Sequence, residues 1–209
     1  APHLSDIDYN FANTLFEQQN YEQAEKLYWS ALGKSPTNIE VHETLNEFYW
    51  QLNQKDHFGR SYKLAIERMP ANMSLRHAYI DSLISAGLFE QAQYVLTQAL
   101  SVERTPQLLA LQGRIAANYN QNSQSIDAFE QSLQQVYDVE VALNLIKILI
   151  MAEDYTKALT YITQAELVAP LHQLLIAYKG LCWQILGDER YEWLIDYQRY
   201  IGAYDIPVP

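Results

Sequence analysis

The sequence is poor in the residues that make loop-rich proteins, because only seven of its 209 residues are glycine and seven are proline. This scarcity argues against a β-protein with many turns. A single cysteine, Cys182, excludes an internal disulfide and fits a reducing compartment, so we expect a cytoplasmic protein. No run of 18 apolar residues and no signal-peptide pattern is present, although the sequence begins at Ala1 rather than Met.

Basic residues are also scarce. The sequence has 14 Lys and Arg against 25 Asp and Glu, which gives a net charge of −11. This charge argues against a nucleic-acid or membrane partner and favours a basic peptide or protein surface. Apolar residues make up 49% of the chain, which is enough for a sizeable core and too much for a disordered protein.

Catalytic and metal-binding motifs are missing as well. None of the five histidines belongs to a His-x-His, His-x-Asp or His-Glu-x-x-His motif, so no zinc or iron site is indicated. There is no glycine-rich phosphate loop and no Gly-x-Ser-x-Gly motif. Cys182 lies between Leu181 and Trp183, where a buried, inert thiol is expected. We therefore predict no catalytic residue, no metal and no cofactor in this chain.

The sequence does contain a repeat. Residues 21–36, YEQAEKLYWSALGKSP, are predicted to form an amphipathic helix that ends before Pro36. Three positions of this helix return at intervals of 33 or 34 residues. The first is a position of small residues: Ala31, Ala65, Ala99, Ser132 and Ala165. One turn earlier is a position of large residues: Tyr28, Tyr62, Leu96, Phe129 and Ile162. One turn earlier again is a second position of mostly small residues: Ala24, Phe58, Ala92, Ser125 and Ala158.

A first helix precedes each of these second helices across a polar turn. The turns are predicted at residues 18–20, 53–56, 86–87, 120–122 and 153–154. We expect a capping box at Asn20 and Gln23, and an N-cap at Thr105 followed by Pro106. The small residues let two antiparallel helices approach closely. Each pair leaves an apolar face uncovered, so the pairs are expected to stack into a solenoid.

This unit resembles the tetratricopeptide repeat, over about residues 5–170 and, in degenerate form, to about residue 203. The resemblance implies an all-α, right-handed superhelical solenoid with a C-terminal capping helix pair, as a single domain over residues 1–209. Phe58, Ile80 and Ile146 stand where small residues are usual, which predicts wider packing in the second and third units. We expect units at 5–38, 39–72, 73–105, 106–138 and 139–171, a capping unit at 172–203 and a tail at 204–209.

In such a superhelix the first helices line a concave groove. The groove positions are acidic in the first three units and end in basic residues in the next two. We therefore predict a protein or peptide partner with a Lys/Arg-rich segment, with Phe16, Trp50 and Ile84 as apolar anchor points. Tetratricopeptide modules that hold a C-terminal carboxylate use Lys, Asn and Arg at these groove positions. Only Asn13 matches that pattern, which argues against a partner held by its C-terminal carboxylate. The predicted groove residues are Tyr9, Asn13, Glu40, Glu43, Glu47, Trp50, His77, Asp81, Arg114 and Lys147.

The C-terminal end differs from the repeats. A helix that ends at Gly187 and an apolar stripe from Trp193 to Tyr204 are expected to cover the last repeat. The pattern from Leu186-Gly187-Asp188 through Trp193-Leu194 to Tyr204-Asp205 also resembles the segment that joins repeats to the catalytic domain in bacterial 2-oxoglutarate/iron(II)-dependent oxygenases. That family holds its iron with a His-x-Asp/Glu motif and a distal His, which this sequence lacks.

Three functions remain open from the sequence. The first is a protein-interaction module that binds a partner in its concave groove. The second is the N-terminal recognition region of a larger 2-oxoglutarate/iron(II)-dependent oxygenase whose catalytic domain is absent from this chain. The third is a self-associating scaffold in which Trp29 and other exposed aromatic side chains pair two copies; the sequence does not predict an oligomeric state.

Overall fold

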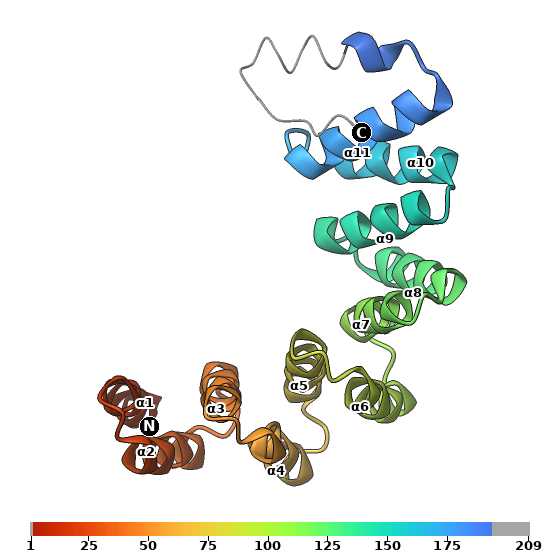
Figure 1. Ribbon diagram of the computed structural model, residues 1–209. Coiled ribbons are helices and arrows are strands. Elements are labelled where there is room, and N and C mark those ends of the chain that lie inside the picture. Colours follow the sequence, from red (N-terminus) through yellow and green to blue (C-terminus); the bar gives the residue numbers. More distant parts are fainter. Residues whose placement is uncertain (1, 194–209) are drawn as a thin grey trace. The chain divides into compact units, whose positions relative to one another are not determined.

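Figure 1 shows the computed structural model, which describes residues 2–193, with side chains from Leu4 onward. The described residues form helices and turns and contain no strand, so the predicted all-α class is confirmed. The chain divides into two compact units, one ending at Ala99 and the other beginning at Leu100. None of the helices in the described range is long and apolar enough to cross a membrane.

The first unit consists of antiparallel helix pairs. Helix α1 packs against α2, α2 packs against α3, and α3 contacts both α4 and α5. A short 3₁₀ turn, Lys55–His57, precedes α4. The helices are α1 (Pro2–Glu17), α2 (Tyr21–Lys34), α3 (Ile39–Gln51), α4 (Arg60–Arg68), α5 (Met73–Ser85) and α6 (Phe89–Val102), of which α6 crosses the boundary between the units.

The second unit repeats the same arrangement. Each of its helices packs against the next, and α9 also contacts α7 and α11. The helices are α7 (Pro106–Asn118), α8 (Asn122–Gln135), α9 (Val139–Met151), α10 (Tyr155–Glu166) and α11 (Gln173–Leu186).

The repeated positions of the second helices form the core, as their spacing predicted. Ala24, Ala92, Ser125 and Ala158 are all 0% exposed, and the large side chains one turn later are buried too. A side chain as small as alanine lets the two helix backbones of a pair approach closely. The large neighbours, such as Tyr28 and Phe129, fill the space beside the contact.

Each first helix ends in the same turn. The backbone is left-handed at Gln19, Asn53, Gly87, Asn120, Glu153 and Gly187. In every case the following N–H bonds back to a carbonyl five residues earlier, as in Asn20 N to Leu15 O at 2.8 Å and Asp154 N to Leu149 O at 2.9 Å. This is the Schellman motif, which satisfies the last carbonyls of a helix and reverses the chain.

The first helices from α3 to α9 begin with a capping side chain in the same place of the repeat. The predicted cap at Thr105 is confirmed, since its hydroxyl accepts a hydrogen bond from Leu108 N at 3.2 Å. Equivalent caps, not predicted from the sequence, are present at Asn38, Asn72 and Asp138. The predicted capping box at Asn20 was wrong, because its side chain makes no cap hydrogen bond.

The second repeat departs from the pattern at Phe58, which occupies the position of a small residue. Its second helix begins only at Arg60, two residues later, so Phe58 lies in the turn before the helix and is buried there. Gly59 follows with a φ of 74°. The bulky ring is therefore accommodated by shortening α4 at its start.

At the C-terminal end, α11 ends at Gly187 as predicted, and Trp183 on it is buried. Asp188 accepts a hydrogen bond from Arg190 Nε at 2.9 Å. This charge-assisted bond lowers the pKa of Asp188 to about 2. The rest of the predicted cap and of the oxygenase-like pattern, from Leu194 onward, lies outside the described residues.

Two glycines with the same backbone conformation allow a test of this packing. Gly59 and Gly87 have φ values of 74° and 73°, but a Cβ at Gly59 would lie 2.5–2.8 Å from the Tyr79 ring, whereas one at Gly87 would meet nothing within 4 Å. We expect Gly87→Ala to cost about 1 kcal/mol, from backbone strain alone. We expect Gly59→Ala to cost about 2–4 kcal/mol, because the clash adds to the strain. Urea unfolding of both variants measures the difference, and equal losses would contradict the packing of Tyr79 on Gly59.

Candidate functional site

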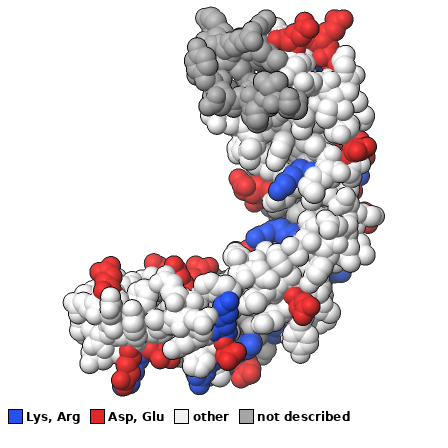
Figure 2. Space-filling view, in the orientation of Figure 1, with Lys and Arg blue, Asp and Glu red and all other residues white. Residues whose placement is uncertain are grey.

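The first unit has a hollow of about 400 Å³ between its first helices α3 and α5. Four of the predicted groove residues line it together: Glu43, Glu47, Trp50 and Asp81. Its other walls are made by Asn46, Phe58, Ser82, Ser85 and Ala86. Figure 2 shows acidic side chains along the edge of the first unit that α1 and α3 form.

The helical spacing of α3 places three of these residues on one side. Glu43, Glu47 and Trp50 follow at i, i+4 and i+7, so their side chains lie above one another along the helix. Asn46, also on α3, holds the segment that carries Phe58, because its Oδ1 accepts a hydrogen bond from Gly59 N at 2.8 Å. That bond holds Phe58 beside Trp50, with ring centroids 5.8 Å apart in an edge-to-face arrangement.

The carboxylates of this hollow repel one another. Partial burial raises the pKa of Glu43, and the negative charges of Asp81 and Glu40 raise it further. A raised pKa means that the surroundings disfavour the negative charge. A cation that enters the hollow would relieve this repulsion.

Trp50 supplies an aromatic face next to these charges. Its side chain is exposed, and Lys55 Nζ lies 4.6 Å from the ring centroid. This is a cation–π contact, in which the negative face of the indole attracts the ammonium group. The hollow thus combines carboxylates with a ring that already binds a lysine of the chain itself.

Two predicted groove residues instead connect α1 to its neighbours. The Tyr9 hydroxyl donates to Glu40 Oε1 at 3.2 Å and shares a hydrogen bond with Thr44 Oγ1 at 3.0 Å. Asn13 Oδ1 accepts a hydrogen bond from the Tyr28 hydroxyl at 2.7 Å. These bonds give Tyr9 and Asn13 structural partners within the unit.

The remaining predicted groove residues lie on other parts of the chain. His77 is half-buried on α5, outside the lining of the hollow. Arg114 on α7 and Lys147 on α9 belong to the second unit, where Arg114 is half-buried and Lys147 exposed. The predicted basic end of the groove stays a prediction.

Three expectations about aromatic and apolar side chains need correction. Ile84 is buried, and Phe16 packs on Phe48 with ring centroids 5.5 Å apart, so of the three predicted anchor points only Trp50 is exposed. Trp29 is half-buried rather than exposed, and its Nε1 donates to the Tyr49 hydroxyl at 3.1 Å. Other aromatic side chains, such as Tyr94 and Tyr119, are exposed, so the self-association hypothesis stays a prediction.

Five lining residues were not among the predicted groove residues: Asn46, Phe58, Ser82, Ser85 and Ala86. The available signal was Phe58, the one bulky residue in a series of small ones. Its size predicted wider helix packing. In the structure, α4 instead begins two residues after Phe58, and the ring forms an aromatic wall of the hollow.

The described residues offer little for redox or metal chemistry. Among residues 2–193 no group of three or more His, Cys, Asp and Glu side chains could hold a metal ion. Cys182 is buried, and this burial raises the pKa of its thiol to about 11. Such a thiol is protonated at neutral pH and is a poor nucleophile.

Helix pairs joined by Schellman turns and packed through small residues define a tetratricopeptide-type repeat fold, and solved structures bear this out. No protein-family model and no curated protein matches the chain. PilW, a type IV pilus biogenesis factor, is 18% identical with a TM-score of 0.69, over 98% of this chain and 96% of that one. A thermophilic tetratricopeptide repeat protein of Thermus thermophilus is 19% identical with a TM-score of 0.59, over 84% and 97%.

A third structure, YrrB, is described as a tetratricopeptide repeat protein with an unusual peptide-binding site. It is 12% identical with a TM-score of 0.59, over 81% of this chain and 89% of that one. At such low identities these likenesses establish the fold, and the chain has the tetratricopeptide repeat fold.

The repulsion at Glu43 can be tested by removing its charge. Because folding raises the pKa of Glu43, its contribution to stability is fully present at low pH and is lost as the pH rises through that raised pKa. We expect Glu43→Gln to be neutral near about pH 4 and to increase the free energy of unfolding at neutral pH by roughly 0.5 kcal/mol or less, since solvent screens an exposed carboxylate.

Urea unfolding at several pH values measures this difference. High salt should reduce the gain, because it screens Asp81 and Glu40. Glu67→Gln removes one carboxylate from the exposed side of α4 and serves as the control for the loss of a single negative charge. A gain from Glu43→Gln that is the same in acid and at neutral pH would contradict the prediction.

Proposed function

We propose that this chain is a protein-interaction module that binds a Lys/Arg-rich peptide segment in the hollow between α3 and α5. The observation that carries the proposal is the meeting of Glu43, Glu47 and Asp81 with Trp50 in one hollow. Carboxylates attract the cationic end of a basic side chain, and an indole face binds the same group by cation–π attraction.

The repulsion between the carboxylates of the hollow supports this function. Partial burial raises the pKa of Glu43, and the charges of Asp81 and Glu40 raise it further, so an incoming cation gains attraction and also relieves repulsion between carboxylates. A volume of about 400 Å³ falls in the range of ligand pockets. The partner would replace or join Lys55 at the face of Trp50.

The proposal can be tested with a fluorescent Lys/Arg-rich peptide, which should bind the protein with an affinity that falls as salt is added. The double variant Glu43→Lys/Glu47→Lys should weaken this binding at least tenfold, which is about 1.4 kcal/mol. Fluorescence anisotropy measures the affinity, and circular dichroism verifies that the variant is folded.

A matched control is the double variant Glu67→Lys/Glu90→Lys. It changes the net charge by the same amount on exposed residues of α4 and α6 that do not line this hollow. We expect less than about a twofold effect, since screened charges outside the hollow contribute little. Equal losses in both double variants would mean that net charge alone attracts the peptide, and the proposed site would be wrong.

A further inference from the structure

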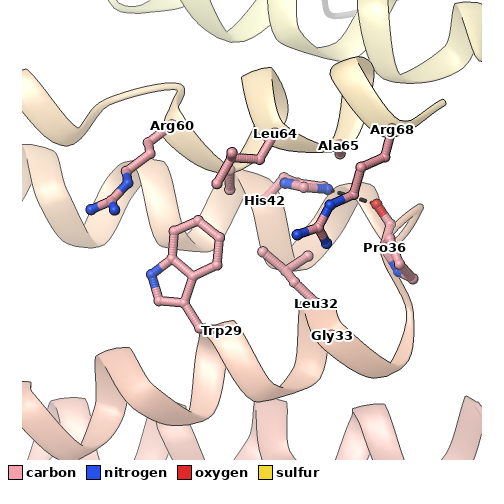
Figure 3. Close-up of a pocket in the computed structure, with 10 residues that line it drawn as sticks. Trp29, Leu32, Gly33, Pro36, His42, Arg60, Leu64, Ala65 and Arg68 are labelled. Atoms are coloured by element: carbon pink, nitrogen blue, oxygen red, sulfur yellow. Dashed lines mark hydrogen bonds between the residues drawn. The ribbon is translucent and has the colours of Figure 1, made fainter. Parts of the chain in front are cut away.

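A second hollow, of about 440 Å³, lies on the first unit between the second helices α2 and α4. Figure 3 shows Arg60 and Arg68 toward its two ends, with Leu64 between them and Trp29 and Leu32 on the opposite side. None of these residues belongs to the predicted groove.

The two arginines occupy one stripe of α4. Arg60, Leu64 and Arg68 follow at i, i+4 and i+8, so they lie on the same side of the helix. Eight residues of helix separate the arginines along the axis by about 12 Å. The hollow therefore has a positive charge at each end and an apolar side chain midway.

These positive charges lack an acidic partner. Among the described residues, neither guanidinium forms an ion pair, and no Asp or Glu lines the hollow. Arg60 Cζ lies 5.9 Å from the ring centroid of Trp29, which orients it over the apolar wall. The hollow is thus lined by positive charge alone, although the chain has a net charge of −11.

The floor of the hollow contains polar atoms that the unit itself does not satisfy. His42 Nε2 donates to Pro36 O at 3.0 Å, because a carbonyl only accepts, and this leaves His42 Nδ1 as a buried acceptor without a partner. Ser61 Oγ is also buried without a partner. Both residues line the hollow and are at most 2% exposed. Buried polar atoms of this kind are uncommon and are frequently satisfied by a ligand or water.

We propose that this hollow binds an extended acidic peptide segment with two carboxylates four residues apart and an apolar side chain midway between them. In an extended strand, four residues span about 13 Å, close to the separation of Arg60 and Arg68. The side chains at i, i+2 and i+4 lie on one face of a strand. The two carboxylates would meet the two guanidiniums, and the middle side chain would pack between Leu64 and Trp29.

The spacing can be tested with three short capped peptides in a Ser/Gly background. The first has Glu at its first and fifth positions and Leu at its third, the second has Glu at its first and third positions and Leu at its fifth, and the third has Gln in place of each Glu of the first. Isothermal titration should show that the first binds at least tenfold more tightly than the other two. Equal binding of all three would overturn the proposal.

The site can be tested by matched variants of α4. Arg60→Gln/Arg68→Gln should weaken binding of the first peptide at least tenfold, because both charge-assisted contacts are lost. Leu64→Glu should also abolish binding, since it places a carboxylate between the two peptide acids. Lys63→Gln removes a positive charge from another side of α4, facing a different hollow, and should change the affinity less than about twofold.

The outcomes separate this site from general electrostatics. Circular dichroism melts establish that each variant is folded, which is expected because Arg60 and Arg68 are exposed. If Lys63→Gln weakens binding as much as the double arginine variant, or if the double arginine variant binds normally, the proposed site is wrong.

Discussion

The close contact between the two helices of each pair is the constraint on which the rest of the structure depends. Ser125 Oγ donates to Gly113 O at 2.9 Å, and a Cβ at Gly113 would lie 2.6 Å from the Phe129 ring. Such distances leave room only for very small side chains at the contact. The repeated turns and the Asx and Thr caps then fix where each helix ends and the next begins, so one local geometry is copied along the chain.

Both candidate sites lie where this constraint is broken. Phe58 is too large for the contact, so α4 starts late, and the ring becomes a wall of the acidic hollow beside Trp50. The shortened α4 also presents Arg60 at its first residue and Arg68 at its last, at the two ends of the basic hollow. Departures from a local rule are expected where a site needs a shape that the rule does not provide.

The repeat spacing was enough to predict the fold, because burial at a period of 33 or 34 residues reflects packing that every unit shares. It also brought Glu43, Glu47 and Asp81 together, since equivalent positions of successive units face the same way. The non-glycine left-handed residues, such as Gln19 and Glu153, could not be predicted, because tertiary packing overrides their intrinsic preference there. The basic hollow was missed because it depends on where α4 starts and on which charges lack partners, and neither can be read from spacing.

The two hollows of the first unit offer opposite charges to a partner, and screening decides whether they act separately. The carboxylates lie on α3 and α5 and line one hollow, whereas the arginines lie on α4 and line the other. At physiological salt the Debye length is about 8 Å, so a ligand in contact with one hollow is attracted mainly by the charges that line that hollow. The net charge of −11 therefore does not prevent an acidic segment from binding at Arg60 and Arg68, because solvent screens carboxylates outside the hollow while the two guanidiniums would contact the segment directly.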